Sequence, residues 1–407
     1  MTAAVASSRL RALAETDADL HGLAERLLGL AEAGLPAMYL PGADTFVFTR
    51  AQGPDGTLEQ RGTSIRYAAI TALGARFLPP DRQRAVLGGH TAEEFAGLLV
   101  QRLPEVSNLG DAALVAWAAA ETGHPKLSDA LDRVAALDAD GRPRYTVEAA
   151  WVLSALAAAR GVLDVEERLG AARDRLLAAR IGDSPLFPHA TGPGLVPWYR
   201  SHIGCFADQT YPLQALARAH ASGVANGGAS DPEALAAAEA CGRRICELQG
   251  GGGQWWWHYD ARRGSVVEGF PVYSVHQHAM APTALFDLAE AGGTDADGGD
   301  FGPAIRRGLR WMTEVPELAA AGAAEPMVLD ELGVTWRKVY RGDPRKAVRA
   351  ARGVGTRVAP GLRLSPLDRV FRPASVDREC RPYEFGWMLF AWLGGDDSNH
   401  ADGGSTT

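Results

Sequence analysis

The sequence lacks the features that mark several classes of protein. Its 41 Lys and Arg residues are outnumbered by 49 Asp and Glu residues, for a net charge of −8. A dedicated nucleic-acid binder is therefore not expected, because neutralising phosphates requires a surplus of cations. No stretch of 18 uninterrupted apolar residues occurs, so we expect no membrane span.

Cysteine is scarce as well. The four cysteines, Cys205, Cys241, Cys246 and Cys380, have no regular spacing, which favours reduced thiols over a disulfide framework. Residues 1–20 mix charged residues with alanine and contain no apolar core, so no secretory signal is expected. Together these absences predict a cytoplasmic protein.

Length alone would allow two or three domains of roughly 150 residues each, although a single large ring or barrel could use the whole chain. Hydrophobic residues make up 46% of the chain, enough for a sizeable core. Alanine is abundant and β-branched residues are sparse, which favours helices over strands. We expect one domain over 1–394, followed by a disordered tail over 395–407 that has hardly any apolar residues.

Apolar periodicity predicts helices of two alternating kinds. Amphipathic helices, which we call outer helices, are expected at 17–34, 92–103, 126–137, 164–180, 232–248 and 300–314. Helices with almost no charge beyond the first turn, the inner helices, are expected at 64–78, 111–121, 146–160, 208–221, 275–291 and 382–395. An evenly apolar helix must be buried on all sides, so the alternation predicts an all-α closed ring of helical hairpins. The longest inserts are 181–207, 249–274 and 315–381, and loops of this length in a compact fold are usually functional.

This pattern resembles the (α/α)6 toroids, which include glucuronyl hydrolases, sugar epimerases, polysaccharide lyases, and the related terpene cyclases and prenyltransferases. A local motif adds to it: Gln249, Gly253 and Trp255 in ICELQGGGGQWW resemble the QW motif of squalene-hopene-type cyclases. The acid motif DxDD and the diphosphate-binding motif DDxxD of terpene cyclases are missing. The resemblance implies a carbohydrate-active enzyme, with a terpene-cyclase-like or prenyl-transfer enzyme as the alternative.

Polar residues on the inner helices fall in or just before the first turn, so they would collect at one end of the ring. They are Arg66, Tyr67, Asn108, Asp111, Tyr145, Glu148, Asp208, Gln209, Tyr211, His276, His278, Tyr383 and Glu384. Helix capping explains some of them, Asp111 above all. Asp208 is the stronger candidate for chemistry, because Arg200, His202, Gln209 and Tyr211 crowd around it in the sequence.

The densest group of polar and aromatic residues runs from 254 to 278. The segment WWWHYDARRGSVVEG predicts a small β-hairpin with DARRG as its turn. Such a hairpin would present alternate residues, Trp256 and His258, to the cavity. Trp255, Trp256 and Trp257 would supply flat surfaces for stacking on sugar rings.

Two kinds of acid–base chemistry fit these residues. Hydrolysis would use two carboxyl groups, with Asp208, Glu268, Glu379 and Glu384 as candidates. An epimerase or lyase would instead use His276, His278 or Tyr273 to move a proton next to a carboxylate. The sequence leaves both open.

A zinc site is a further alternative. Cys205, Asp208 and either His276 or His278 are the ligand types of the prenyltransferase zinc site, but the Cys-x2-Asp order is the reverse of that family's order. We assign no metal and no cofactor.

The stretch from Arg337 to Arg381 holds 13 Lys or Arg and only 4 Asp or Glu, which suggests an anionic partner. A solvated surface loop is the alternative. Arginine suits bidentate recognition of carboxylate or phosphate, so the expected partner is a small anionic substrate.

The sequence therefore predicts an enzyme that acts on an anionic sugar or oligosaccharide, with a non-catalytic glycan- or peptide-binding ring as the third alternative. The predicted catalytic residues are Asp208, His276, Tyr273, Glu268 and Glu384. The predicted substrate-binding residues are Arg66, Tyr67, Arg200, His202, Gln209, Tyr211, Trp255, Trp256, Trp257, His258, His278, Arg378, Arg381, Tyr383 and Trp387.

Overall fold

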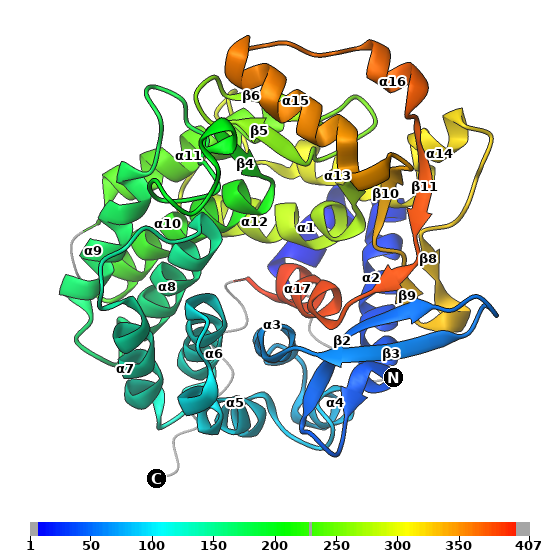
Figure 1. The fold of residues 1–407 in the computed structure, drawn as a ribbon. Coiled ribbons are helices and arrows are strands. Elements are labelled where there is room, and N and C mark those ends of the chain that lie inside the picture. Colours follow the sequence, from blue (N-terminus) through cyan, green and yellow to red (C-terminus); the bar gives the residue numbers. More distant parts are fainter. Residues whose placement is uncertain (1–6, 228–229, 396–407) are drawn as a thin grey trace.

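The computed structural model describes residues 7–227 and 230–395. Within these residues, six largely buried helices form a closed ring (Figure 1). They are α3 (Ile65–Ala75), α6 (Leu109–Glu121), α8 (Thr146–Ala159), α10 (Ala207–Ala225), α12 (Ala281–Glu290) and α17 (Pro382–Leu393). Each contacts the next along the chain, and α17 contacts α3, so the last helix closes the ring on the first. The predicted inner helices are confirmed.

Amphipathic helices surround the ring. In the described part of the chain they are α2 (Ala18–Gly34), α5 (Ala92–Gln101), α7 (Leu127–Asp138), α9 (Glu166–Ala178), α11 (Pro232–Glu247) and α13 (Gly302–Glu314). Their starts are fixed by side chains that satisfy free backbone N–H groups: Asp17 accepts from Leu20, and Thr91 and Glu94 form a capping box. The alternation of outer and inner helices confirms the predicted (α/α)6 arrangement.

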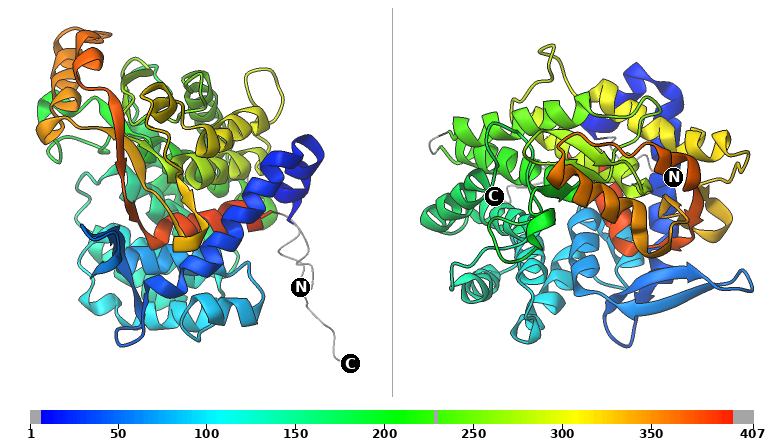
Figure 2. Two further views of the ribbon diagram at one scale, coloured as in Figure 1. Left: turned by 90° about the vertical axis from the view of Figure 1, so that its right-hand side faces the viewer. Right: turned by 45° about the horizontal axis from the view of Figure 1, so that its top comes forward.

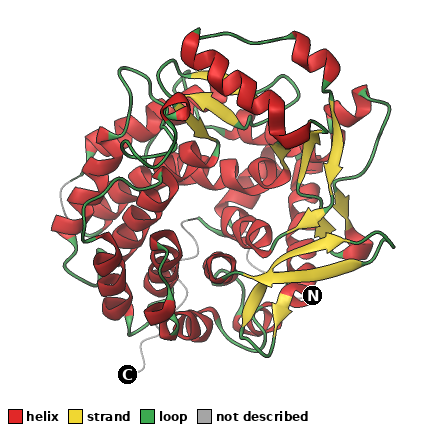
Figure 3. Cartoon of the chain, viewed as in Figure 1, coloured by secondary structure: helices red, strands yellow, loops and turns green. Residues whose placement is uncertain are grey.

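Small antiparallel sheets lie in the inserts between the helices (Figure 3). The sheets are β1 (Tyr39–Leu40), β2 (Thr45–Gln52), β3 (Leu58–Thr63) and β12 (Glu379–Cys380); β4 (Ile203–Cys205), β5 (His258–Asp260) and β6 (Ser265–Glu268); β7 (Val272–Tyr273), β10 (Lys338–Arg341) and β11 (Pro373–Asp377); and β8 (Val328–Leu329) with β9 (Val334–Thr335). The predicted hairpin is β5–β6. The other strands were not expected, because most are too short to show a period of two.

Five further α-helices among the described residues lie outside this alternation. They are α1 (Ser8–Thr16), α4 (Pro80–Val86), α14 (Pro316–Ala320), α15 (Ala347–Val358) and α16 (Pro366–Val370). The helices α15 and α16 lie on one face of the ring, and α1 lies on the opposite face (Figure 2). No helix among the described residues is both long and apolar enough to cross a membrane. The predicted tail lies outside the described residues, apart from Gly395.

Candidate active site

A cavity of about 200 Å³ lies among the N-terminal ends of the inner helices. Its polar and aromatic lining consists of Arg66, Tyr67, Trp151, Tyr211, Trp257, Tyr273, His276, Arg337 and Tyr383. The sequence predicts all of these except Trp151 and Arg337. The first turns of several helices meet here, and their free N–H groups favour an anion.

His276 is the imidazole that faces the cavity. It opens a π-helical turn, His276–Met280, directly before α12, and such turns are frequent at functional sites. Its ring is stacked on Trp257, with ring centroids 5.8 Å apart. The ring centroids of His276 and Phe206 are 4.5 Å apart. One ring nitrogen is engaged by a hydrogen bond to the backbone of Trp255, whereas Nδ1 has no partner among the described residues. Burial holds the pKa of His276 well below its ordinary value, so the ring is neutral at pH 7.

Tyr273 and Arg337 stand beside His276. The Tyr273 and His276 ring centroids are 4.9 Å apart, and the Arg337 guanidinium carbon lies 5.0 Å from the Tyr273 ring centroid. Burial raises the pKa of Tyr273, so its hydroxyl keeps its proton at neutral pH. A neutral base, a neutral acid and a fixed cation therefore share one wall of the cavity.

Other residues of the lining are held by stacking and charged hydrogen bonds. Tyr67 and Tyr383 are stacked with centroids 4.7 Å apart, and Nη1 of Arg381 donates to the Tyr67 hydroxyl at 2.9 Å. Arg66 is held by Asp111, whose Oδ1 lies 2.7 Å from Nε. Asp111 thus lies near the cavity but is already paired.

Two residues predicted at the site act from behind its wall. Trp387 is buried and donates from Nε1 to the Tyr211 hydroxyl at 2.9 Å, so it positions a cavity residue without lining the cavity. Glu384 is fully buried, and Oε1 lies 3.8 Å from Nε of Arg337. Burial raises the pKa of Glu384 to about 8, which makes the carboxyl group largely neutral at pH 7.

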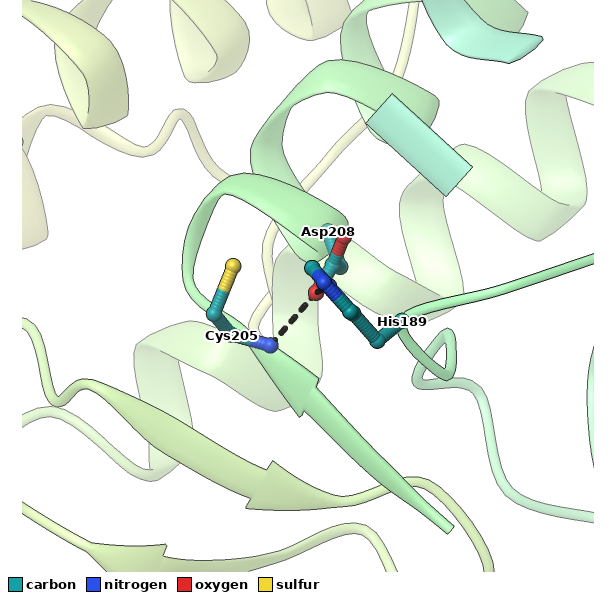
Figure 4. Close-up of side chains that lie close together, drawn as sticks. All are labelled: His189, Cys205 and Asp208. Carbon is teal, nitrogen blue, oxygen red and sulfur yellow. Dashed lines mark hydrogen bonds and ion pairs between the residues drawn. The ribbon is translucent and has the colours of Figure 1, made fainter. Parts of the chain in front are cut away.

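Asp208 is not joined to His276, its predicted partner. Its Oδ2 accepts from the backbone N–H of Cys205 at 2.6 Å and is 2.8 Å from Nδ1 of His189 (Figure 4). The charge of Asp208 raises the pKa of His189. The sequence analysis missed His189, a single histidine in the insert 181–207 without a surrounding motif.

The structure groups a different set of candidate zinc ligands from the set that the sequence suggests. The ligand atoms of His189, Cys205 and Asp208 lie within 4.8 Å of one another, whereas neither His276 nor His278 joins this group. The direct hydrogen bond between His189 and Asp208 already provides the carboxylate with a partner. The arrangement is that of a carboxylate–imidazole pair at the rim of the ring.

Three other predicted residues hold the protein together away from the cavity. Glu268 is buried and accepts from Nη1 of Arg352 at 2.9 Å and from Nη2 of Arg341 at 3.3 Å, so both of its oxygens are engaged. Gln209 bonds the backbone of the insert preceding α10, and Nε2 of His202 lies 3.1 Å from Oγ1 of Thr356. All three are absent from the cavity lining.

The hairpin is present, but the prediction of which of its residues face the cavity is wrong by one position. Trp257 faces the cavity in place of Trp256, which packs against Phe270 and lines a separate groove. His258 is buried against Trp257, with centroids 5.5 Å apart, and Trp255 is fully buried. The register shift between His258 and Tyr259 places an extra residue, Val267, in β6. Trp256 and Trp257 precede β5, so alternation along a strand does not decide which of them faces the cavity.

The QW-like segment holds two parts of the fold together. The Gln249 amide donates to the carbonyls of Gly253 and Ala304, and its oxygen accepts from Nε of Arg307. Gln249 thereby ties the turn before the hairpin to α13, and Trp255 packs in the core beside it.

Of the remaining predicted residues, one is buried and two are exposed. His278 is fully buried, and burial lowers its pKa to about 3. Arg378 is on the surface, where it is paired with Glu325 at 2.8 Å. Arg200 is exposed on the insert before β4.

No model of a known protein family matches this sequence, and no curated protein matches it. Solved structures do match. An unsaturated glucuronyl hydrolase specific for heparin is 13% identical, with a TM-score of 0.55 over 92% of this chain and 96% of its own. A cellobiose 2-epimerase from Bacillus thermoamylovorans is 10% identical, with a TM-score of 0.57 over 91% of this chain and 99% of its own.

A sugar epimerase from a ruminal bacterium is 9% identical, with a TM-score of 0.58 over 93% of this chain and 100% of its own. At identities this low, the likeness establishes the fold, the (α/α)6 toroid, over nearly the whole chain.

Proposed function

We propose that this protein is a carbohydrate-active enzyme that moves a proton at the carbon next to the carboxylate of an acidic sugar, leading to epimerisation or elimination. The observation that carries the proposal is the wall formed by His276, Tyr273 and Arg337. His276 takes the proton, and Arg337 stabilises the negative charge that develops on the carboxylate. The hydroxyl of Tyr273 returns a proton to the carbon or to the leaving oxygen.

Hydrolysis by a carboxyl pair is less well supported. Glycosidases generally place two carboxyl groups on either side of the bond they cleave. Among the described residues that line the cavity, none is a carboxylate. Asp111 is paired with Arg66, a cavity residue, and Glu384 is buried 3.8 Å from Nε of Arg337.

An anionic substrate is favoured by the cavity's own charges. Arg66 and Arg337 line it, and the first turns of α8, α10 and α17 point their N–H groups toward it. The glucuronyl hydrolase and the two epimerases named above act on sugars, which agrees with the proposal. A terpene-cyclase-like activity is disfavoured, because two guanidinium groups would repel a carbocation.

The proposal is tested by supplying uronate-containing mono- and disaccharides in D2O. We expect deuterium to enter the carbon next to the carboxylate, visible by NMR, together with an epimer or an unsaturated product. His276→Asn and Tyr273→Phe should each lower kcat about 100- to 10,000-fold, the usual contribution of a positioned acid or base. His21→Gln, on the outer helix α2, serves as the control and should keep full activity.

Two results would overturn the proposal. Full activity in His276→Asn with unchanged folding would remove His276 as the base. Binding of acidic sugars without any exchange or turnover would instead support the non-catalytic glycan-binding ring. We also propose that the protein works in the cytoplasm, which its four unpaired thiols support.

A further inference from the structure

A second cleft, of about 390 Å³, lies next to the cavity between β7, β10 and the start of α15. Tyr273 lines both spaces. Three carboxylates line the cleft together with five cations. The cations are Lys338, Arg341, Arg345, Lys346 and Arg349. In a chain of net charge −8, this is a local reversal of sign.

Only some of these cations are neutralised. Lys338 is paired with Asp377, and Arg341 is held between Glu268 and Asp368. These two cations therefore serve the fold, since they tie β10 to β11 and to the hairpin.

The other three cations have no partner. Among the described residues, no carboxylate lies within 4.0 Å of Arg345, Lys346 or Arg349, and no hydrogen bond from their side chains is present. Asp343, the nearest acid in the sequence, accepts from the backbone N–H of Val348 at 2.9 Å. Burial and the nearby charge of Arg200 lower the pKa of Arg349, and the charge of Asp343 opposes this shift. Positive charge is therefore in excess at this edge of the cleft.

The backbone is strained at the same place. Arg345 and Lys346 have φ values of 50° and 58°, in the left-handed region that non-glycine residues rarely adopt. Residues in this conformation persist where the surrounding structure enforces them, often at ligand sites. The strain holds two adjacent cations at the entrance to α15, above the cleft.

We propose that this cleft binds a second acidic group of the same substrate molecule, so that the substrate is an acidic oligosaccharide rather than a single sugar acid. The inference rests on the proposed function, because it assumes that the reacting unit occupies the cavity. Tyr273 lies where the chain would pass from the cavity to the cleft. Carboxylate and sulfate groups both suit the exposed Arg345 and Lys346 and the half-buried Arg349.

The test is a binding series on the full chain carrying His276→Asn, which prevents turnover. The probes are oligogalacturonides of increasing length, the same oligomers with methyl-esterified carboxyl groups, and sulfated oligosaccharides of matched length. We expect affinity, measured by calorimetry, to rise about 10-fold at the length that reaches the cleft, for charged oligomers only. Arg345→Gln combined with Lys346→Gln should remove that gain, whereas the exposed Arg369→Gln on α16 should retain it.

Each outcome decides the proposal. A gain shared by the methyl esters, or one kept by the double variant, overturns it. Equal binding of a single-stranded oligonucleotide overturns it in favour of a non-specific polyanion surface. A gain with carboxylated but not sulfated oligomers assigns the group to uronates, and the reverse result assigns it to sulfated sugars.

The two proposals fail separately. If no acidic sugar is ever turned over but the double variant loses the length-dependent gain, the proposed function fails and the cleft assignment stands. If turnover is found and the gain is absent, only the cleft assignment fails.

Discussion

Glu384 links a residue-scale property to the stability of the whole protein. Its pKa is raised to about 8 by burial, above the ordinary value of a glutamate, so the folded state binds this proton more tightly than the unfolded state. The stability that the neutral carboxyl group provides is therefore complete at low pH and is lost as pH rises from about 5 to 8. A neutral Glu384 does not balance the charge of Arg337, whose other carboxylate neighbours are Glu379 at 3.6 Å and Asp377 at 3.8 Å.

We predict that Glu384→Gln removes this pH dependence. Between pH 5 and pH 8, the free energy of unfolding in urea should fall in the original protein by on the order of a few kcal/mol more than in the variant. Glu167→Gln, exposed on α9, is the control and should follow the original protein. Parallel curves for the original protein and Glu384→Gln would show that this carboxyl group is not held neutral.

The sequence predicts the polar site residues in the first turns of inner helices and misses some of those that lie in long inserts. Residues in the first turn of an inner helix, such as Arg66 and His276, are located by helical periodicity alone. Arg337 and His189 lie in long inserts, and their approach to the site depends on strand pairing and loop packing that leave no local pattern. Glu268 was misassigned because its neutralising partners, Arg341 and Arg352, lie 73 and 84 residues away.

At the scale of elements, close contact between inner helices depends on small residues. A Cβ atom at Gly74 of α3 would overlap the carbonyl oxygen of Gly386 on α17, and a Cβ at Gly386 would lie 2.7 Å from the carbonyl oxygen of Ile70. Both obstacles are backbone atoms, which cannot move aside without shifting a helix. The contact between α3 and α17 is also the one that closes the ring.

We predict that Gly74→Ala destabilises the protein by about 1–3 kcal/mol, because overpacking outweighs the better helix propensity of alanine. Urea denaturation measures the change. Gly29→Ala provides the matched control: nothing lies within 4 Å of a Cβ there, in the middle of α2. It should stabilise the protein by up to about 1 kcal/mol, and an equal response of the two variants would contradict the argument from close packing.

The elements themselves were largely predictable, whereas their fine placement was not. Charge on one side of a helix or on none is a local signal, so the alternation of outer and inner helices could be inferred from sequence. The hairpin was also inferred, but the shift between His258 and Tyr259 depends on how β5 fits between β4 and β6. Trp256 and Trp257 precede β5, so the alternation of a strand could not decide which of them lies in the cavity.

At the scale of the whole molecule, the two ends of the ring differ in chemistry. One end holds the cavity. At the other, Arg9, Arg76 and Arg218 meet Glu121, Asp287 and Glu290 in a balanced group of three cations and three carboxylates. Arg9 comes from α1, at the start of the chain, and Asp287 from α12, so this group joins distant parts of the sequence. We expect it to close the ring rather than to bind a ligand, because its charges balance.

Arg9 tests that interpretation. It is buried, and its Nη2 lies 2.7 Å from Oδ1 of Asp287 while Nη1 donates to the carbonyl of Ala391 at 3.0 Å. Arg9→Met should lower the free energy of unfolding by about 3–5 kcal/mol, because it leaves the buried group with three carboxylates and only two cations. Arg26→Met, whose exposed partner is Asp330, should cost less than about 1 kcal/mol.

The double variant Arg9→Met with Asp287→Asn distinguishes the destabilisation caused by losing the ion pair from that caused by losing side-chain packing. Since both charges are then removed, its destabilisation should be smaller than the sum of the two single changes. Unfolding followed by fluorescence and by circular dichroism should stay a single coincident transition, because α1 seals the ring against α12 and α17. Strict additivity, or an early separate transition for α1, would show that the N-terminal helix is an appendage and that the ring closes without it.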